Sequence, residues 1–595
     1  MPRFKIENDF YLGGEPFKIL SGAIHYFRIP AEDWYHSLYN LKALGFNTVE
    51  TYVAWNLHEP IEGKFNFEGA LDLEKFLQIA QELGLYAIVR PSPFICAEWE
   101  FGGLPAWLLT KPMRIRSSDP AYIEAVARYY DQLLPRLVPR LLDNGGNILM
   151  MQVENEYGSY GEDKSYLRAI RKLMEDRGID CPLFTSDGPW RATLKAGTLI
   201  EEDLFVTGNF GSKAPYNFSQ MQEFFDEYGK KWPLMCMEFW DGWFNRWKEP
   251  IITRDPEELA EAVREVLEQG SINLYMFHGG TNFGFMNGCS ARGTLDLPQV
   301  TSYDYDALLD EEGNPTAKYL AVKKMMATHF PEYPQLEPLY KESMEMESIP
   351  LVEKVSLFET LDSLASPTES LYPKVMEELG QSYGYLLYRT EASWDAEEER
   401  LRIIDGRDRA QLFVDGQWIA TQYQTEIGED IYCQGNREGF SEIDILIENM
   451  GRVNYGHKFL ADTQRKGIRT GVCKDLHFML NWKQYPLPLD NPEKIDFSKG
   501  WTEGQPAFYA FDFTVEEPKD TYLDLSEFGK GVAFVNGRHL GRFWNVGPTL
   551  SLYIPHSYLK EGANRIIIFE TEGEYKEEIH LTRKPTLKHI KGENL

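Results

Sequence analysis

The chain has 595 residues, more than one hydrophobic core usually serves, so its length predicts roughly two to four domains. Apolar residues make up 43% and aromatic residues 14%, a composition that indicates a folded, ring-rich protein and excludes a disordered one. The 61 Lys and Arg residues against 92 Asp and Glu residues give a net charge of −31, which disfavours nucleic acid and anionic lipid as partners.

The sequence gives little sign of a membrane span, a secretion signal or a metal site. No apolar run approaches the ~18 residues that a membrane span needs, and the first ten residues lack the apolar core of a secretion signal. We therefore expect a cytoplasmic protein without a membrane partner. The six cysteines lie far apart, with no C-x-x-C pair and no histidine at metal spacing, so reduced thiols and no metal site are predicted.

Between residue 17 and about residue 330, short apolar runs alternate with longer amphipathic stretches, which predicts β-strands and α-helices in turn. Nearly continuous apolar runs are typical of strands buried on both faces of a parallel sheet. Eight strand–helix alternations predict an N-terminal TIM (β/α)8 barrel, the catalytic domain, over residues 1–330. The eight strands are expected near residues 17–27, 46–55, 85–90, 147–153, 181–186, 204–208, 232–237 and 272–278.

Two of the intervening helices carry clear end signals. Gly84 follows one apolar stripe and predicts its C-terminal stop. Asp255 can cap the other helix, and Pro256 suits its first turn. The apolar stripe of the first helix consists of Leu73, Phe76, Leu77, Ala80 and Leu83.

The pattern changes after the barrel. Residues 331–338 are rich in proline and residues 341–348 are acidic, so the range 331–380 is predicted to be a linker that can include the first strands of a β-domain. A first all-β domain is expected over 381–490. A second, galactose-binding-like all-β domain is expected over 491–595.

The two β-domains repeat one another in sequence. Asp415-Gly416 and Asn536-Gly537 are hairpin signals at matching places. Because the offset between matching segments is nearly constant, we predict two related sandwich or jelly-roll domains. The matching segments are 413–420 with 534–541 and 445–448 with 567–570.

Polar residues follow several of the predicted barrel strands. In a TIM barrel such residues meet at the C-terminal rim, where active sites form. Three carboxylates among many rings, without a metal cluster, suit glycoside hydrolysis, which needs one acid, one attacking carboxylate and no cofactor. For Trp240 and Trp243, sugar stacking and core packing both remain open. The rim residues include Tyr52, Cys96, Ala97, Glu98, Asn155, Glu156, Glu238 and Tyr305.

Glu154 and Glu156 raise a separate question. In an ideal strand, residues two apart share one face, so periodicity does not decide which of these two carboxylates is catalytic.

The whole chain resembles glycoside hydrolase family 35, the β-galactosidases that pair a TIM barrel with trailing β-domains. Long motifs in one order carry the resemblance. They are residues 21–28 (SGAIHYFR), 50–59 (ETYVAWNLHE), 90–107 (RPSPFICAEWEFGGLPAW), 152–159 (QVENEYGS), 237–243 (MEFWDGW), 276–284 (MFHGGTNFG), 301–306 (TSYDYD) and 451–456 (GRVNYG).

The resemblance implies roles for individual residues. Glu156 would be the acid/base, Glu238 the nucleophile and Glu154 a structural neighbour. Trp243 would stack the leaving group, and Tyr455 is expected to reach the same side of the pocket. Galactose would be held by Tyr52, the main chain around Cys96 and Ala97, Glu98, Asn155 and Tyr305.

The sequence therefore predicts an exo-acting, retaining β-galactosidase that acts on galactose-terminated oligosaccharides. Two alternatives are a retaining β-glycosidase for another sugar and a non-catalytic galactose-binding lectin. We expect the β-domains to provide scaffolding and the contacts of a homodimer.

Overall fold

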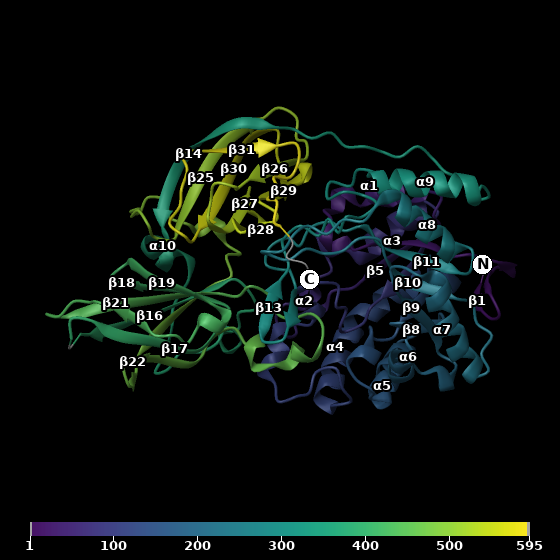
Figure 1. The fold of residues 1–595 in the computed structure, drawn as a ribbon, viewed down its shortest axis with the longest axis horizontal. Coiled ribbons are helices and arrows are strands. Elements are labelled where there is room, and N and C mark those ends of the chain that lie inside the picture. The colour runs from purple at the N-terminus through teal and green to yellow at the C-terminus, as the bar shows by residue number, and fades with distance from the viewer. Residues whose placement is uncertain (1–2, 395, 592–595) are drawn as a thin grey trace.

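The computed structural model describes residues 3–394 and 396–591. The ends of the predicted first and last domains, residues 1–2 and 592–595, lie outside the described residues. Figure 1 places a helix-covered barrel in one half of the molecule and two β-sheet domains in the other. No helix in the described part of the chain is both long and apolar enough to cross a membrane.

The N-terminal half is a closed barrel of eight parallel strands in the order β10-β11-β4-β5-β6-β7-β8-β9. The predicted TIM barrel and all eight of its strands are confirmed. Their residues are almost all buried, as near-continuous apolar runs require. The strands are β4 (Leu20–Ile24), β5 (Thr48–Tyr52), β6 (Tyr86–Arg90), β7 (Ile148–Gln152), β8 (Leu183–Asp187), β9 (Phe205–Asn209), β10 (Met235–Trp240) and β11 (Ser271–His278).

Helices surround the barrel. Asp72 caps α3 by accepting a hydrogen bond from Lys75 N over 2.9 Å, and Asp255 caps α8 in the same way. The chain turns at Gly84, whose φ is +75°, so the predicted stop is confirmed. The larger helices are α1 (Trp34–Ala43), α3 (Leu73–Glu82), α4 (Pro120–Leu137), α5 (Lys164–Glu175), α6 (Arg191–Gly197), α7 (Ala214–Glu227), α8 (Pro256–Leu267) and α9 (Ala317–His329).

A small three-stranded sheet closes the N-terminal end of the barrel. Its strands are β1 (Phe4–Ile6), β2 (Phe10–Leu12) and β3 (Glu15–Pro16). Phe4 and Phe10 share one apolar cluster with side chains from five barrel strands, β6 to β10. A binding site inside the barrel can therefore open only at the C-terminal rim.

The first β-domain is a sandwich of a six-stranded and a four-stranded sheet, whose strand orders are β15-β24-β16-β21-β18-β19 and β20-β17-β22-β23. Apolar side chains from both sheets form one core. The strands are β15 (Thr368–Ser370), β16 (Tyr385–Ser393), β17 (Glu399–Arg407), β18 (Arg409–Val414), β19 (Gln417–Tyr423), β20 (Ile431–Cys433), β21 (Phe440–Glu448), β22 (Gly467–Lys474), β23 (His477–Phe478) and β24 (Trp482–Leu487).

The second β-domain has eight strands in the order β28-β27-β30-β25-β14-β31-β26-β29. Side chains from both halves of this sheet share one core, so the sheet folds over on itself as a jelly roll does. The strands are β14 (Met346–Ser356), β25 (Ala507–Val515), β26 (Thr521–Asp524), β27 (Lys530–Val535), β28 (Arg538–Trp544), β29 (Ser551–Ile554), β30 (Gly562–Glu570) and β31 (Glu578–Thr582).

Chain order and domain order differ in the β-half. Strand β14 comes before the first β-domain in sequence, yet it pairs with β25 and β31 of the second. The first β-domain is thus inserted into the second, and α10 (Leu357–Leu364) follows β14 at the crossing point. The range 331–380 contains both β14 and β15.

Strand pairing confirms the predicted repeat. Strands β18 and β19 form a hairpin on β21, and β27 and β28 form the equivalent hairpin on β30. Asp415 and Asn536 open the two hairpin turns with the same left-handed φ of 50°. In both hairpins the register shifts just before the turn.

Candidate active site

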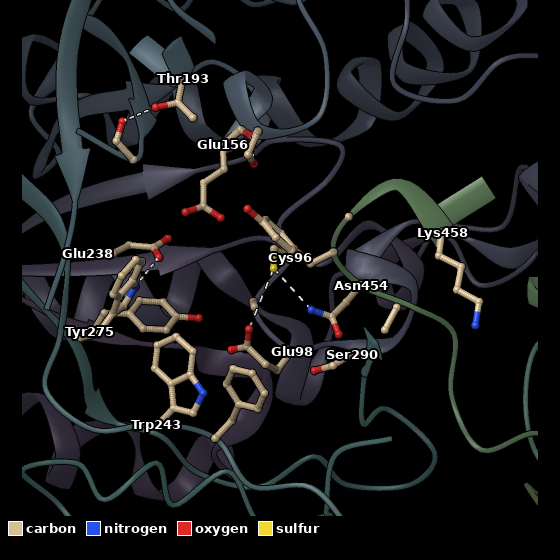
Figure 2. A pocket seen from close by; sticks show the side chains of 18 of the residues that line it. Cys96, Glu98, Glu156, Thr193, Glu238, Trp243, Tyr275, Ser290, Asn454 and Lys458 are labelled. Carbon is tan, nitrogen blue, oxygen red and sulfur yellow. Dashed lines mark hydrogen bonds between the residues drawn. The ribbon is translucent and has the colours of Figure 1, made fainter. Parts of the chain in front are cut away.

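One cavity of about 480 Å³ lies at the C-terminal rim of the barrel. This volume is within the range of about 300–1,000 Å³ that is usual for ligand sites. Tyr52 and Asn155 do not line the cavity, whereas the other predicted site residues do. Figure 2 shows the carboxylates of Glu156 and Glu238 pointing into the same space from different walls. The predicted residues that line it are Cys96, Ala97, Glu98, Glu156, Glu238, Trp240, Trp243, Tyr305 and Tyr455.

Glu156 follows β7 on a turn whose backbone is left-handed, with φ 47° at Glu156 itself. Its main-chain N–H donates to Ser186 O over 3.0 Å, and its carboxylate accepts a hydrogen bond from Asn209 Nδ2 over 3.0 Å. Burial, together with the nearby charge of Glu238, raises the pKa of Glu156 to about 8. A carboxyl group with this pKa is protonated at neutral pH and can act as a general acid.

Glu154 does not reach the cavity. Strand β7 ends at Gln152, and Glu154 has a left-handed φ of 53°, so the ideal-strand geometry that places Glu154 and Glu156 on one face does not apply. The Glu154 side chain is 1% exposed and forms a bidentate ion pair with Arg116, at 2.8 and 2.9 Å. Its carboxylate also accepts from Tyr166 OH over 2.9 Å. Glu154 therefore stabilises the turn that carries Glu156.

Glu238 lies near the end of β10, beside a positive charge. Arg90 Nη2 contacts Glu238 Oε1 at 2.8 Å, and both Tyr52 OH and Trp240 Nε1 donate hydrogen bonds to the same carboxylate. The fully buried Arg90 also faces Glu50, at 3.7 Å. A guanidinium stabilises the anionic form of its partner, which suits a nucleophilic carboxylate.

Tyr52 and Asn155 lie directly behind Glu238. Asn155 Oδ1 accepts hydrogen bonds from Tyr52 OH and Arg90 Nη2, both over 2.9 Å. The Asn155 amide donates to Ile95 O over 3.2 Å. Through these contacts the two side chains can orient Glu238 and Arg90.

The segment Cys96–Ala97–Glu98 follows β6 with three consecutive left-handed residues, at φ 56°, 52° and 48°. Such a conformation costs non-glycine residues about 1–2 kcal/mol each and is concentrated at functional sites. Burial raises the pKa of Glu98 to about 7, and a hydrogen bond from Tyr303 OH counteracts part of this rise. In Figure 2, Cys96 and Glu98 lie below the carboxylates of Glu156 and Glu238.

Aromatic rings form the remaining barrel walls of the cavity. Trp240 and Trp243 meet edge to face with ring centroids 5.7 Å apart, and both are partly exposed to the cavity. Tyr305 meets Tyr275 edge to face at 5.6 Å. Such faces can pack against the apolar face of a sugar ring.

A loop of the first β-domain, residues 451–458, completes the cavity. Asn454 donates to Cys96 Sγ over 3.3 Å and accepts from Cys289 N over 2.9 Å, and Tyr455 lines the wall beside it. Arg452 anchors the loop with a fully buried ion pair to Glu100, at 2.7 Å. The partner hairpin on the barrel consists of β12 (Cys289–Arg292) and β13 (Leu295–Pro298).

Several residues of the site do not figure among the predicted residues. Asn209 ends β9, so the rim logic applied to the other strands could also have found it. Arg90 is the last residue of β6, and the sequence predicted it only as part of a strand. Tyr275, Tyr303 and Asn454 come from segments far apart in the chain, and their proximity depends on the tertiary fold.

A TIM barrel whose rim presents a neutral acid, an arginine-paired carboxylate and several aromatic rings is the architecture of a glycoside hydrolase. The chain belongs to the glycosyl hydrolases family 35, whose profile matches residues 9–329. Two further profiles, "Beta-galactosidase, first all-beta domain" and "Beta-galactosidase, galactose-binding domain", match residues 373–488 and 506–564. The protein is thus a hydrolase of the β-galactosidase family.

Full-length relatives agree with this assignment. Beta-galactosidase-1-like protein 2 of Homo sapiens is 40% identical over 94% of this chain and 88% of its own length. Beta-galactosidase of Xanthomonas manihotis is 40% identical over 92% of this chain and 90% of its own length. Beta-galactosidase of Mus musculus is 38% identical over 96% and 92%, respectively.

Proposed function

We propose that the protein is an exo-acting, retaining β-galactosidase that removes terminal non-reducing β-D-galactose from oligosaccharides by double displacement. The observation that carries this proposal is the pair formed by Glu156 and Glu238, two carboxylates in one cavity, of which Glu156 has a pKa raised to about 8 and Glu238 contacts Arg90 at 2.8 Å. The relatives of Xanthomonas manihotis and Mus musculus, both named beta-galactosidase, support galactose as the sugar that is released.

In the first step, Glu156 donates its proton to the glycosidic oxygen while Glu238 attacks C1 of the sugar. The bond from C1 to the leaving oxygen breaks, and an ester forms between C1 and Glu238. Esterification removes the negative charge of Glu238, so the pKa of Glu156 falls. Glu156 is then an anion that can take a proton from water as the water attacks C1 and releases galactose.

The shape of the cavity supports exo action. The small β1-β2-β3 sheet closes the barrel below, and the 451–458 loop with the β12-β13 hairpin walls one side. A closed pocket accepts a chain end rather than the middle of a polysaccharide. Glu98, which lines the cavity, can hydrogen-bond sugar hydroxyls and so reject epimers that leave its carboxylate without a partner.

The role of each carboxylate can be tested by azide rescue. We expect azide to restore turnover of a nitrophenyl galactoside by Glu238→Ala with α-galactosyl azide as product, and by Glu156→Ala with β-galactosyl azide. The configuration of each product is read by NMR. Glu223→Ala, an exposed change on α7, is the control and should need no azide. Exchanged products would reverse the two assignments.

The alternative functions have their own tests. Faster turnover of nitrophenyl glucoside or mannoside than of the galactoside would replace galactose as the preferred sugar. A lectin that carries Glu238→Gln would still bind galactose, which is its whole function. The proposed enzyme with the same change should lose nearly all turnover.

A further inference from the structure

The position of the general acid defines the leaving-group side of the cavity. If the proposed function holds, the leaving oxygen departs next to Glu156, so the aglycone extends along the wall beyond this residue. That wall is built from the turn after β7, the loop after β8 and the start of α6. Its members are Ser159, Gly188, Trp190 and Thr193.

Trp190 is the prominent side chain of this wall. Its side chain is 53% exposed although it lines the cavity, whereas Trp240 and Trp243 are only partly exposed. Trp240 and Trp243 pair with each other, and Trp243 also stacks on Phe244, whereas no other aromatic ring of residues 3–394 and 396–591 packs on that of Trp190. Trp190 therefore lies further out than Trp240 and Trp243, at the mouth of the cavity, with apolar surface available to a ligand.

The backbone holds the Trp190 ring in place. Thr193 Oγ1 lies within hydrogen-bond distance of Gly188 O (2.7 Å) and Trp190 O (2.8 Å), and Leu194 N donates to Trp190 O over 3.0 Å. The ring lies over Gly188 so closely that a Cβ at this position would be 2.1 Å from Trp190 Cζ3. A ring fixed in this way loses little freedom when it binds a ligand.

The same framework carries the general acid. Glu156 N donates to Ser186 O, and Gly158 N donates to Asp187 Oδ1 over 2.7 Å. Asp187 directly precedes Gly188, so the Trp190 platform and Glu156 are both attached to the end of β8. Their separation is thus set by the fold.

We propose that Trp190 is a distal aglycone subsite, a platform for the sugar next but one to the terminal galactose. This inference deepens the proposed function and depends on it. The ligand class is a linear, galactose-terminated oligosaccharide of at least three pyranose units. The indole would pack against the apolar face of the third ring, in the manner of aromatic side chains in sugar sites.

The test measures kcat/KM for a nitrophenyl β-galactoside and for a galactose-terminated trisaccharide in the same assay. In Trp190→Ala, the ratio of the trisaccharide value to the nitrophenyl value should fall about five- to tenfold, through the KM of the trisaccharide. Trp190→Phe, which keeps a ring, should lose less. Gly188→Ala displaces the ring without removing it and should lower the same ratio.

The matched control is Trp418→Ala, which removes a tryptophan of similar exposure, 55%, from β19 of the first β-domain. It should leave both kcat/KM values as in the wild type. An unchanged ratio in Trp190→Ala, or equal losses for both substrates, would overturn the distal subsite. Failure of the proposed function would look different, because the wild-type protein would then turn over neither galactoside.

Discussion

At the scale of single residues, Glu156 and Glu238 carry the same functional group in different surroundings. Glu156 receives one amide hydrogen bond in a half-buried place, and desolvation together with the charge of Glu238 raises its pKa to about 8. Glu238 receives a guanidinium at 2.8 Å, which stabilises its negative charge. Double displacement requires one carboxyl group that gives a proton and a second carboxylate that attacks C1.

We expect a substitution of Asn209 to change the pKa of Glu156. Its amide hydrogen bond to Glu156 lowers the pKa of that carboxyl against the effect of burial, and Ser186 Oγ fixes the amide by donating to its oxygen over 2.6 Å. In Asn209→Ala, the pKa of Glu156 should rise further. The alkaline limb of kcat/KM for a nitrophenyl galactoside, near pH 8 in the wild type, should therefore move to higher pH.

The maximum of the same profile should fall roughly tenfold or more, because the acid loses the partner that orients it. Asn217→Ala, which removes an amide on α7 that donates to Ser212 O over 2.8 Å, is the matched control. A limb that moved to lower pH in Asn209→Ala would contradict the donor role of this amide.

At the scale of elements, the site depends on a loop that the barrel does not contain. The segment Cys96–Glu98 is held in its left-handed conformation between the barrel and residues 451–458 of the first β-domain. Asn454 joins the two by contacting Cys96 Sγ and accepting from Cys289 N. The first β-domain therefore takes part in building the cavity wall, beyond serving as a scaffold.

Removal of the Asn454 amide should weaken sugar binding. Asn454→Ala leaves Cys289 N without this acceptor and loosens the segment before Glu98, a loss on the order of 1–3 kcal/mol by analogy with other buried hydrogen bonds. We expect the KM for a nitrophenyl galactoside to rise about tenfold. Asn491→Ala, which removes an amide bonded to Leu364 O in the β-half, should leave KM unchanged. An equal KM for both variants would refute the role of the loop.

At the scale of elements, some features of the fold and of the site were predictable from the sequence and others were not. Apolar runs located the eight barrel strands, and the Asp-Gly and Asn-Gly turn signals located the two hairpins, because these patterns are local in the sequence. Periodicity did not resolve Glu154 from Glu156, because β7 ends at Gln152 and the backbone of both glutamates is left-handed, so strand alternation does not apply to them. The contacts of Tyr303 with Glu98 and of Asn454 with Cys96 join distant segments, and no local pattern encodes them.

At the scale of the whole molecule, buried charges join the three bodies. Glu448, on the first β-domain, lies 2.7 Å from Lys530 and 2.9 Å from Arg542 of the second. Arg542 also donates to Asn287 of the barrel over 2.8 Å. The linker contributes Lys341, which lies between Asp33 of the barrel and Asp520 of the second β-domain, at 3.1 and 2.6 Å. These contacts fix the loop that completes the active site.

Glu448 offers the sharpest test of this arrangement. Glu448→Gln leaves two buried cations without their anion, and breaking a buried pair in this way costs about 3–5 kcal/mol. Tm at pH 7 should therefore fall clearly. The control is Glu442→Gln on the same strand, whose exposed pair with Arg389 at 3.2 Å is expected to contribute only about 0–1 kcal/mol.

The pH dependence of the Tm difference follows from the pKa of Glu448. Burial raises this pKa, but Lys530 and Arg542 outweigh burial and hold it below the usual value of 4.5. A carboxyl whose pKa is lower in the folded than in the unfolded state contributes its full stability above the unfolded value and loses it as the pH falls. The Tm difference between wild type and Glu448→Gln should thus be largest near neutral pH and shrink below pH 4.5. A difference that stayed constant down to acid pH would mean that the ionised carboxylate does not hold the domains together.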